Sequence, residues 1–431
     1  IIFIMTPKQG DIFTKEFLGA VQNLTEQSWQ LPWSTRVDSI TNYQHTTGLE
    51  DDLIVENLVE NSSELNAAAI ARVKQVALNE PVIINRLLAK DGGLATVNIA
   101  VHIPELSEHE NAHMVAKSRE LRDKMKLLYP DIEFRLTGNV FLSNAFSEIA
   151  QADMSNLMPI MIVILLVTLG VLLRSISGTF STLVVIILSI ITTMGIFGWL
   201  GWTLTPSSAS APIIIMTMVV ADCVHILVSF LQNMRMGQEK LAAIKESIRI
   251  NLLPIFITSL TTLLGFLSMN FSEVPPIRDL GNTVAIGILA AFLLSIFFLP
   301  ALMSLLPVRV KVQEKYESRT MNALSNYVIN NRSWLLWGTT ALTLIMIISA
   351  SENEINDEFI KYFSTNTEFR QDTDYLEKNM SGIYTMEYSL SSGKENGISD
   401  PDFLADVEKL TLWLRSRDEV EHVSTMTDVF K

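Results

Sequence analysis

Six long apolar windows constrain the fold of this 431-residue chain more than any other feature of its sequence. A helix needs roughly 20 mostly apolar residues to cross the hydrocarbon core of a bilayer. The chain is 48% hydrophobic, and this content is concentrated in the windows. We therefore expect a polytopic membrane protein. The windows are residues 157–173, 180–200, 212–231, 252–271, 284–306 and 334–350.

The formal net charge of −14 is unevenly distributed along the chain. Residues 1–156 carry 13 Lys and Arg against 21 Asp and Glu, and residues 351–431 carry 8 against 18. Acidic regions outside the membrane argue against a nucleic-acid partner, because phosphate binding needs a basic face. Cys223 is the only cysteine, so no disulfide can form within the chain.

Basic residues in the short loops predict the orientation in the membrane. The loops after the first, third and fifth windows together hold ten Lys or Arg, whereas the two alternate loops hold only Arg278. The positive-inside rule places the ten-residue set in the cytoplasm. Residues 1–156 and 351–431 then lie on the extracytoplasmic side.

The region before the windows has the pattern of an α+β domain. "VIINRLL" and "LATVNIAVHI" flank "AKDGG", which indicates a β-hairpin. Helices segregated against an antiparallel sheet favour a sandwich of ferredoxin-like type. We expect helices over 14–29 and 109–127, strands over 1–5, 36–41 and 132–138, and a helical insertion over 50–79.

An internal repeat relates the two soluble regions. Residues 17–42 align without gaps on residues 403–428, at a constant offset of 386. We interpret this as the start of a second copy of the same domain. By this interpretation the sequence is a fragment, with an initial span before Ile1 and a second helix bundle after Lys431. The identical pairs include Phe17 with Phe403, Leu18 with Leu404, Val21 with Val407, Leu24 with Leu410, and Thr25 with Thr411.

The stretch "MVVADCVHILVSF" places Asp222 and His225 inside the third window. A central Asp costs roughly 2.5 to 3.5 kcal/mol on membrane-insertion scales, so such residues are functional by default. His225 follows by three residues, on the same helix face, and imidazole titrates in the physiological range. We expect a proton relay. Two alternatives remain open: a protonated Asp222 that only hydrogen-bonds a neighbouring helix, and a His225 that only orients Asp222.

The next window carries small and hydroxylated residues, namely Thr258, Ser259, Thr262 and Gly265. Such residues let helices approach closely and can hydrogen-bond between them. They either support the relay as partners of Asp222 or serve packing alone.

"HENAH" at 109–113 matches the H-E-x-x-H pattern of zinc peptidases. The flanking acids suit a capped helix start instead, with Ser107 as the cap and Glu110 in the first turn. No third ligand follows downstream, so we interpret the match as accidental and expect no metal, no cofactor and no hydrolase activity.

Several motifs in this order resemble the resistance–nodulation–division (RND) superfamily, and within it the MMPL-type exporters, whose helix bundle is related to the sterol-sensing domain. "VVADCVHILVSF" is similar to the family's intramembrane acid motif, and "ITSLTTLLGFLSM" to the Ser/Thr-rich motif of the next span. "PIRDLGNTVAIGILAAF" and "LPALMSLLP" resemble the start and end of the following span. Many relatives have Tyr after the acid, where this chain has Cys223, so a relay through a phenol is in doubt.

The resemblance covers nearly the whole chain and implies an architecture. Its parts are a porter-like α+β domain (1–150), a five-span bundle (151–306), a basic cytoplasmic connector (307–333), a sixth helix (334–350) and the start of a second α+β domain (351–431). This is an RND-type half with the beginning of its second repeat, in the inner membrane of a bacterium.

The same resemblance implies proton-driven export of a hydrophobic or lipid-like substrate, with protons as the coupling ion and membrane lipids as surroundings. It leaves open a homo-oligomer or a periplasmic partner protein. Two other functions are compatible with it: a lipid- or sterol-sensing membrane protein without turnover, and an accessory of protein translocation like the SecD/SecF branch.

Overall fold

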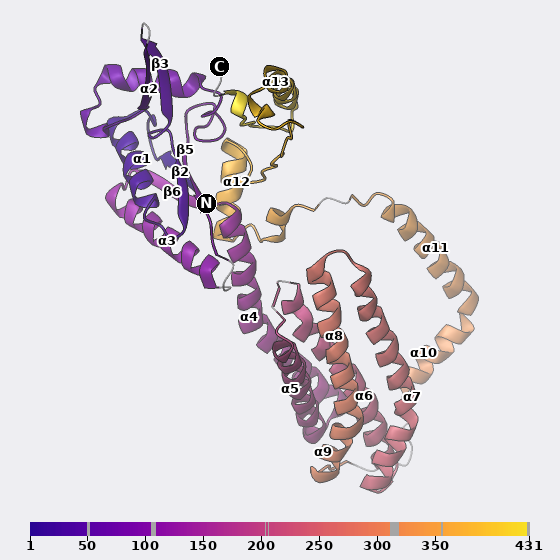
Figure 1. Ribbon diagram of the computed structural model, residues 1–431. Coiled ribbons are helices and arrows are strands. Elements are labelled where there is room, and N and C mark those ends of the chain that lie inside the picture. The colour runs from indigo at the N-terminus through magenta and orange to yellow at the C-terminus, as the bar shows by residue number, and fades with distance from the viewer. Residues whose placement is uncertain are drawn as a thin grey trace. The chain divides into compact units, whose positions relative to one another are not determined.

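The computed structural model describes residues 1–49, 52–104, 109–202, 204–205, 207–310, 319–354 and 357–428 (Figure 1). It divides into two compact units. The first is Ile1–Phe146 with Asn356–Lys431, and the second is Ser147–Ile355.

The first unit is built on a four-stranded sheet whose neighbouring strands are all antiparallel. The central strand β1 buries the consecutive residues Phe3, Ile4 and Met5, so both of its faces are covered. The outer strand β6 pairs directly with β1, and the outer strand β2 is joined to β1 through β5. The strand order is β2 (Ser34–Asp38), β5 (Ala95–Val101), β1 (Ile2–Pro7) and β6 (Ile132–Thr137).

Helices α1 (Lys15–Ser28) and α3 (His109–Leu128) pack against this sheet. Thr14 caps α1, because its side chain accepts a hydrogen bond from the backbone N–H of Phe17. One face of α1 is buried in the core, including Leu18 and Leu24. Both helices and the three strands expected around them are confirmed, with ends shifted by a few residues.

Two predictions for this unit are wrong. Residues 82–88 form turns with isolated bridges rather than the first arm of a hairpin, since Asn85 adopts a left-handed conformation (φ 59°) and interrupts the strand. The apolar residues Ile83 and Leu88 of this loop fill the core instead. The insertion after residue 50 is not wholly helical, because a hairpin of β3 (Gln44–Leu49) and β4 (Asp52–Asn57) precedes helix α2 (Ala67–Asn79).

Helix α12 (Glu368–Asn379) covers the open edge of β6. Its Asp372 accepts a hydrogen bond from the backbone N–H of Leu136 (3.0 Å) and pairs with Arg135 (3.0 Å). Burial raises the pKa of Asp372, and the bonds from Leu136 and Arg135 oppose that rise. A strand edge that would otherwise attract other chains is therefore closed by a helix.

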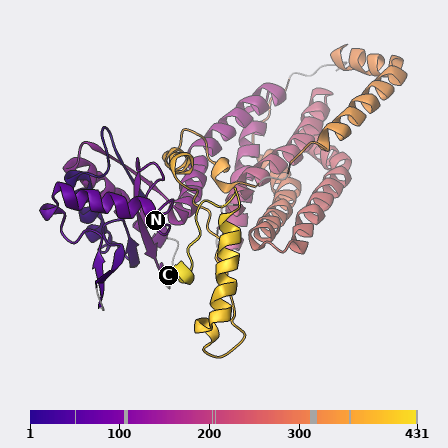
Figure 2. The same ribbon diagram turned by 90° about the horizontal axis from the view of Figure 1, so that it is seen from above.

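Helix α13 (Pro401–Arg415), yellow in Figure 2, occupies the position in the sequence repeat that corresponds to α1. Thr25 donates its hydroxyl to the carbonyl of Val21 (2.7 Å), and Thr411 donates to that of Val407 (2.8 Å). The turns that follow also correspond: the N–H of Ser39 bonds the Asn42 side chain, and the N–H of Thr425 bonds Asp428. Unlike β2, residues 420–424 form no strand.

The second unit contains the helices that are long and apolar enough to cross a membrane, including most of α4. Across the described residues there are six such helices, which confirms the six predicted spans by length and composition. In Figure 1, α5 to α8 lie side by side, and α9 continues the span of α8. The bounds are α4 (Asn139–Leu173), α5 (Ile176–Trp199), α6 (Ala211–Arg235), α7 (Lys240–Leu267), α8 (Pro275–Leu293), α9 (Leu299–Leu305), α10 (Arg319–Asn330) and α11 (Arg332–Ala350).

Two glycines let α8 approach its neighbours closely. A Cβ atom on Gly287 would lie 2.3 Å from Cδ1 of Ile215 on α6, and one on Gly281 would lie 2.5 Å from the backbone oxygen of Phe266 on α7. No side chain fits at either crossing. A π-helical turn, η4 (Leu294–Phe298), connects α8 to α9 within one continuous span.

Candidate functional site

Asp222 lies on α6 inside the bundle, with 5% of its surface exposed. Val219 precedes it by three residues and Ile226 follows it by four, so both are buried on the same side of the helix. The adjacent Cys223 is buried as well. Its Oδ2 atom is 3.5 Å from the hydroxyl of Ser259 on α7. This distance is at the outer limit for a hydrogen bond, so the carboxyl is only weakly held.

A second polar contact lies next to the acid. The Sγ atom of Cys223 is 3.7 Å from the hydroxyl of Ser295, which sits in the π-helical turn η4. π turns occur mostly as single-turn insertions, often at functional sites. The sequence analysis missed Ser295. Its one local signal is Pro300, which lacks the N–H that would bond back along the helix and so favours an irregular turn.

Helix α7 faces α6 with one residue in every four. Ser247 donates its hydroxyl to the carbonyl of Ile226 (2.6 Å), and Asn251 donates its amide to the hydroxyl of Ser229 (2.8 Å). With Ser259 these residues occupy one helix face, at spacings of four and eight. The sequence analysis did not identify Ser247 or Asn251, although their spacing with Ser259 is visible in the sequence. The full buried row is Ala243, Ser247, Asn251, Ile255 and Ser259.

The structure places His225 on the exposed surface of α6, whereas Asp222 is buried on the same helix. Within the described part of the chain, no hydrogen bond joins its ring to the carboxyl. His225 and Asp222 are therefore close in sequence and on α6 together, but they face different surroundings.

The hydroxyl side chains of α7 likewise divide into a buried group and an exposed group. Thr258 is exposed and donates to the carbonyls of Pro254 and Ile255, and Thr262 donates to the carbonyl of Thr258. Ser259, rather than these two threonines, contacts the acid. Because these hydroxyls donate within their own helix, only the lone pairs of their oxygens remain for a neighbour. Gly265 is also exposed, and an added Cβ would have no atom within 4 Å.

The "HENAH" segment begins helix α3, and its His113 ring packs edge-on against Trp33, with centroids 5.9 Å apart. Ser107, the predicted cap, lies outside the described residues. Among the residues that are described, no group of three or more His, Cys, Asp or Glu could hold a metal ion. The His113 ring therefore packs against an aromatic side chain.

What this site can do follows from its few polar groups. An ionised Asp222 would have one hydroxyl partner among the described residues, in otherwise apolar surroundings. Burial of a charge with so little compensation is costly, whereas a neutral carboxyl is tolerated. A group in this position can change charge inside the bundle and so alter the contact between α6 and α7.

Comparison with known proteins agrees with the membrane architecture. The model of the MMPL family matches residues 19–341, which is more than half of the chain. No curated protein matches this chain. The match includes α1 to α10 and the start of α11, and therefore the helix that carries Asp222. The chain thus belongs to the MMPL family and is an integral membrane protein of the RND transporter type.

Proposed function

We propose that this protein exports a hydrophobic or lipid-like molecule and that protons moving through the bundle drive the export. The observation that carries the proposal is Asp222, a carboxyl buried in a membrane-spanning helix with Ser259 as its polar partner. Intramembrane carboxyls of this kind mark proton pathways in pumps and transporters.

The row on α7 supports a route for the proton. Below Asp222 and Ser259, the side chains of Asn251 and Ser229 meet, and Ser247 reaches the backbone of α6 one turn further on. These groups follow the α6–α7 contact toward the end of the bundle that carries Lys240 and Arg235. Polar groups at intervals along one contact give water and protons a path that lipid-facing surfaces lack.

Coupling would follow from the unequal packing around α6. Close contact at Gly287 joins α6 to α8, whereas the contact of α6 with α7 combines buried apolar residues such as Ile255 with side-chain hydroxyls and the Asn251 amide. Neutral and ionised forms of Asp222 would favour different positions of α7 relative to α6. A protonation change can shift a conformational equilibrium only by such a difference between states.

The exposed face of α6 and α7 supports contact with further membrane helices. His225, Thr258, Thr262 and Gly265 present small or polar groups there, which is unusual for a surface that meets only lipid. We propose that further membrane helices cover this face and that His225 acts in the relay toward them.

The first unit would guide the substrate outside the inner membrane. Its strand order, with two β–α–β halves and neighbours all antiparallel, supports a ferredoxin-like assignment for residues 1–150. The matching hydrogen bonds of α1 and α13 support residues 351–431 as the start of a second such domain. The loop charges support an extracytoplasmic position for both.

The test is Asp222→Asn in the full-length protein, reconstituted in vesicles with an imposed pH gradient. We expect folding, judged by size-exclusion chromatography, to be retained and proton movement, followed with a pH-sensitive dye, to fall to the level of empty vesicles. Glu273→Gln is the matched control, since Glu273 is exposed before α8. Lipid analysis of a strain carrying each variant identifies the exported class.

Gradient-dependent transport by the Asp222→Asn protein at the normal rate would contradict the relay. Lipid binding that is unchanged by collapse of the gradient, with no transport by the unmodified protein, would instead favour a lipid-sensing function.

A further inference from the structure

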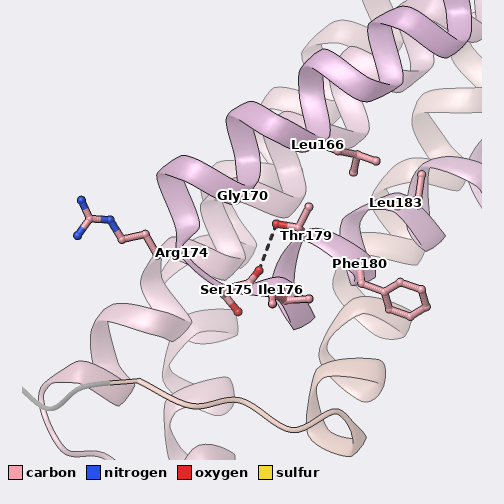
Figure 3. Close-up of a pocket in the computed structure, with 8 residues that line it drawn as sticks. All are labelled: Leu166, Gly170, Arg174, Ser175, Ile176, Thr179, Phe180 and Leu183. Atoms are coloured by element: carbon pink, nitrogen blue, oxygen red, sulfur yellow. Dashed lines mark hydrogen bonds between the residues drawn. The ribbon is translucent and has the colours of Figure 1, made fainter.

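An apolar groove lies between the end of α4 and the beginning of α5, remote in sequence from Asp222 (Figure 3). Its volume is about 530 Å³. Ligand pockets in proteins typically measure roughly 300 to 1,000 Å³. The groove is therefore large enough to hold a substantial part of a small hydrophobic molecule.

The walls are apolar for identifiable reasons. Leu166 on α4 and Leu183 and Phe180 on α5 supply aliphatic and aromatic surface. Thr179 donates its hydroxyl to the carbonyl of Ser175 (3.1 Å, dashed in Figure 3), so that polar group is satisfied within α5 itself. Gly170 leaves the floor open: a Cβ there would lie 3.9 Å from the Thr179 hydroxyl, an ordinary contact distance.

The length of the groove matches one leaflet. Leu166 and Arg174 are eight residues apart, which corresponds to about 12 Å along a helix. One half of a hydrocarbon core is roughly 15 Å deep. A lipid tail lying along α4 would therefore run most of the depth of its leaflet against the protein.

Positive charge marks the open end. Arg174 follows the last residue of α4, and its side chain extends outward from the helix end (Figure 3). It is exposed, and none of the described residues pairs with its guanidinium. Arg235 reaches the same end, where it donates to the carbonyl of Leu173 (3.1 Å). The groove lining contains no acidic side chain.

We propose that this groove binds one anionic phospholipid, with an acyl chain between α4 and α5 and the phosphate paired with Arg174. An apolar slot of leaflet depth with a cation at its mouth is complementary to such a lipid in shape and in charge. Basic residues near a membrane surface attract anionic headgroups, and an arginine can reach outward to them while its stem stays on apolar surface. The proposal does not depend on proton coupling.

The experiment uses the full-length protein in nanodiscs of phosphatidylcholine that contain a minor fraction of phosphatidylglycerol with a photoreactive group on its acyl chain. Peptides that become labelled are located by mass spectrometry, and phosphatidylcholine with the same group serves as the neutral probe. We expect the unmodified protein to be labelled on α4 and α5 preferentially by phosphatidylglycerol.

Two variants separate the tail from the headgroup. Gly170→Leu fills the floor and should lower labelling of the groove residues 166–183 by both probes to the level of the lipid-facing parts of α4 and α5. Arg174→Asn removes the charge while suiting the left-handed backbone at this position (φ 51°). It should lower phosphatidylglycerol labelling about fivefold, the factor expected for one basic residue near an anionic surface, and leave phosphatidylcholine labelling unchanged.

The matched controls are Gly195→Leu, on α5 where an added side chain meets no atom within 4 Å, and Lys245→Asn, an exposed cation on α7. Both should label like the unmodified protein, and chromatography of each variant confirms that it is folded. Equal labelling of Gly170→Leu and Gly195→Leu proteins, or equal labelling of the unmodified protein by the two probes, would overturn the proposal.

Discussion

The two segments related by the sequence repeat, residues 17–42 and 403–428, share local structure but differ in tertiary structure. Each forms a helix at the same alignment position, with the same threonine hydroxyl bonded one turn back and the same side-chain bond in the following turn. Only the first copy continues into a strand, because β2 has β5 beside it. Helix and turn are thus specified by nearby residues, whereas a strand also requires a partner.

The largest expected effect compares Leu24 with its equivalent Leu410. Leu24 is fully buried, so Leu24→Ala should destabilise the first unit by about 2 to 5 kcal/mol, the range for truncated core leucines. Leu410 is partly exposed, and Leu410→Ala should cost less than half as much. Hydrogen exchange of the β1 and β5 amides in the full-length protein measures the first effect, and exchange of the α13 amides measures the second. Equal effects would mean that the second copy is packed as tightly as the first.

A smaller effect is expected in the turns. Asn42 accepts from the N–H of Ser39 (2.8 Å) and donates to the carbonyl of Val37 (2.7 Å), so Asn42→Ala should cost roughly 1 to 3 kcal/mol. Asp428→Asn keeps an acceptor for Thr425 and should cost no more than about 1 kcal/mol through its weakened pair with Arg415. Exchange rates of the Ser39 and Thr425 amides report each turn. The comparison fails if Asp428→Asn frees the Thr425 amide as fully as Asn42→Ala frees that of Ser39.

The smallest effect concerns pH and affects only the second copy, where His422 stands in place of Arg36. The Nδ1 atom of His422 is 3.0 Å from the carbonyl of Ile84, and burial lowers the pKa of this ring below its ordinary 6.5. The unfolded segment then binds protons more readily than the folded one, so stability falls as the pH drops below about 6.5.

Amide exchange in residues 83–88, measured across this range, should accelerate on acidification, and His422→Gln should reduce the dependence. An unchanged profile in the variant would assign the dependence to another group.

Elements whose signal is local were predictable from sequence. The six spans rest on apolar length, and α1 and α3 rest on periodicity. Residues 82–88 were not, because a run of β-formers indicates a strand whether its side chains form a ladder or fill a core. The position of Asn85, which interrupts the run, acquires its meaning only from the fold.

The candidate site was predictable in part. Asp222 stands out because a charge in an apolar window is costly. The neighbours of Asp222 do not stand out in the sequence, since Ser259 and Thr258 are chemically similar. Only the rotation of α7 determines which of the two faces the acid. Ser295 depends on a π-helical turn, and such a turn changes the face on which every later residue lies.

The crossing at Gly287 restricts where a small inhibitor could work. Because bare backbone on α8 rests against Ile215, a compound has no volume to enter between α6 and α8. The α6–α7 contact is different, because it also includes side-chain hydroxyls and the Asn251 amide, whose hydrogen bonds a ligand could replace. A compound bound there would hold α6 and α7 in one arrangement. Resistance would then arise through substitutions on α7 rather than on α8.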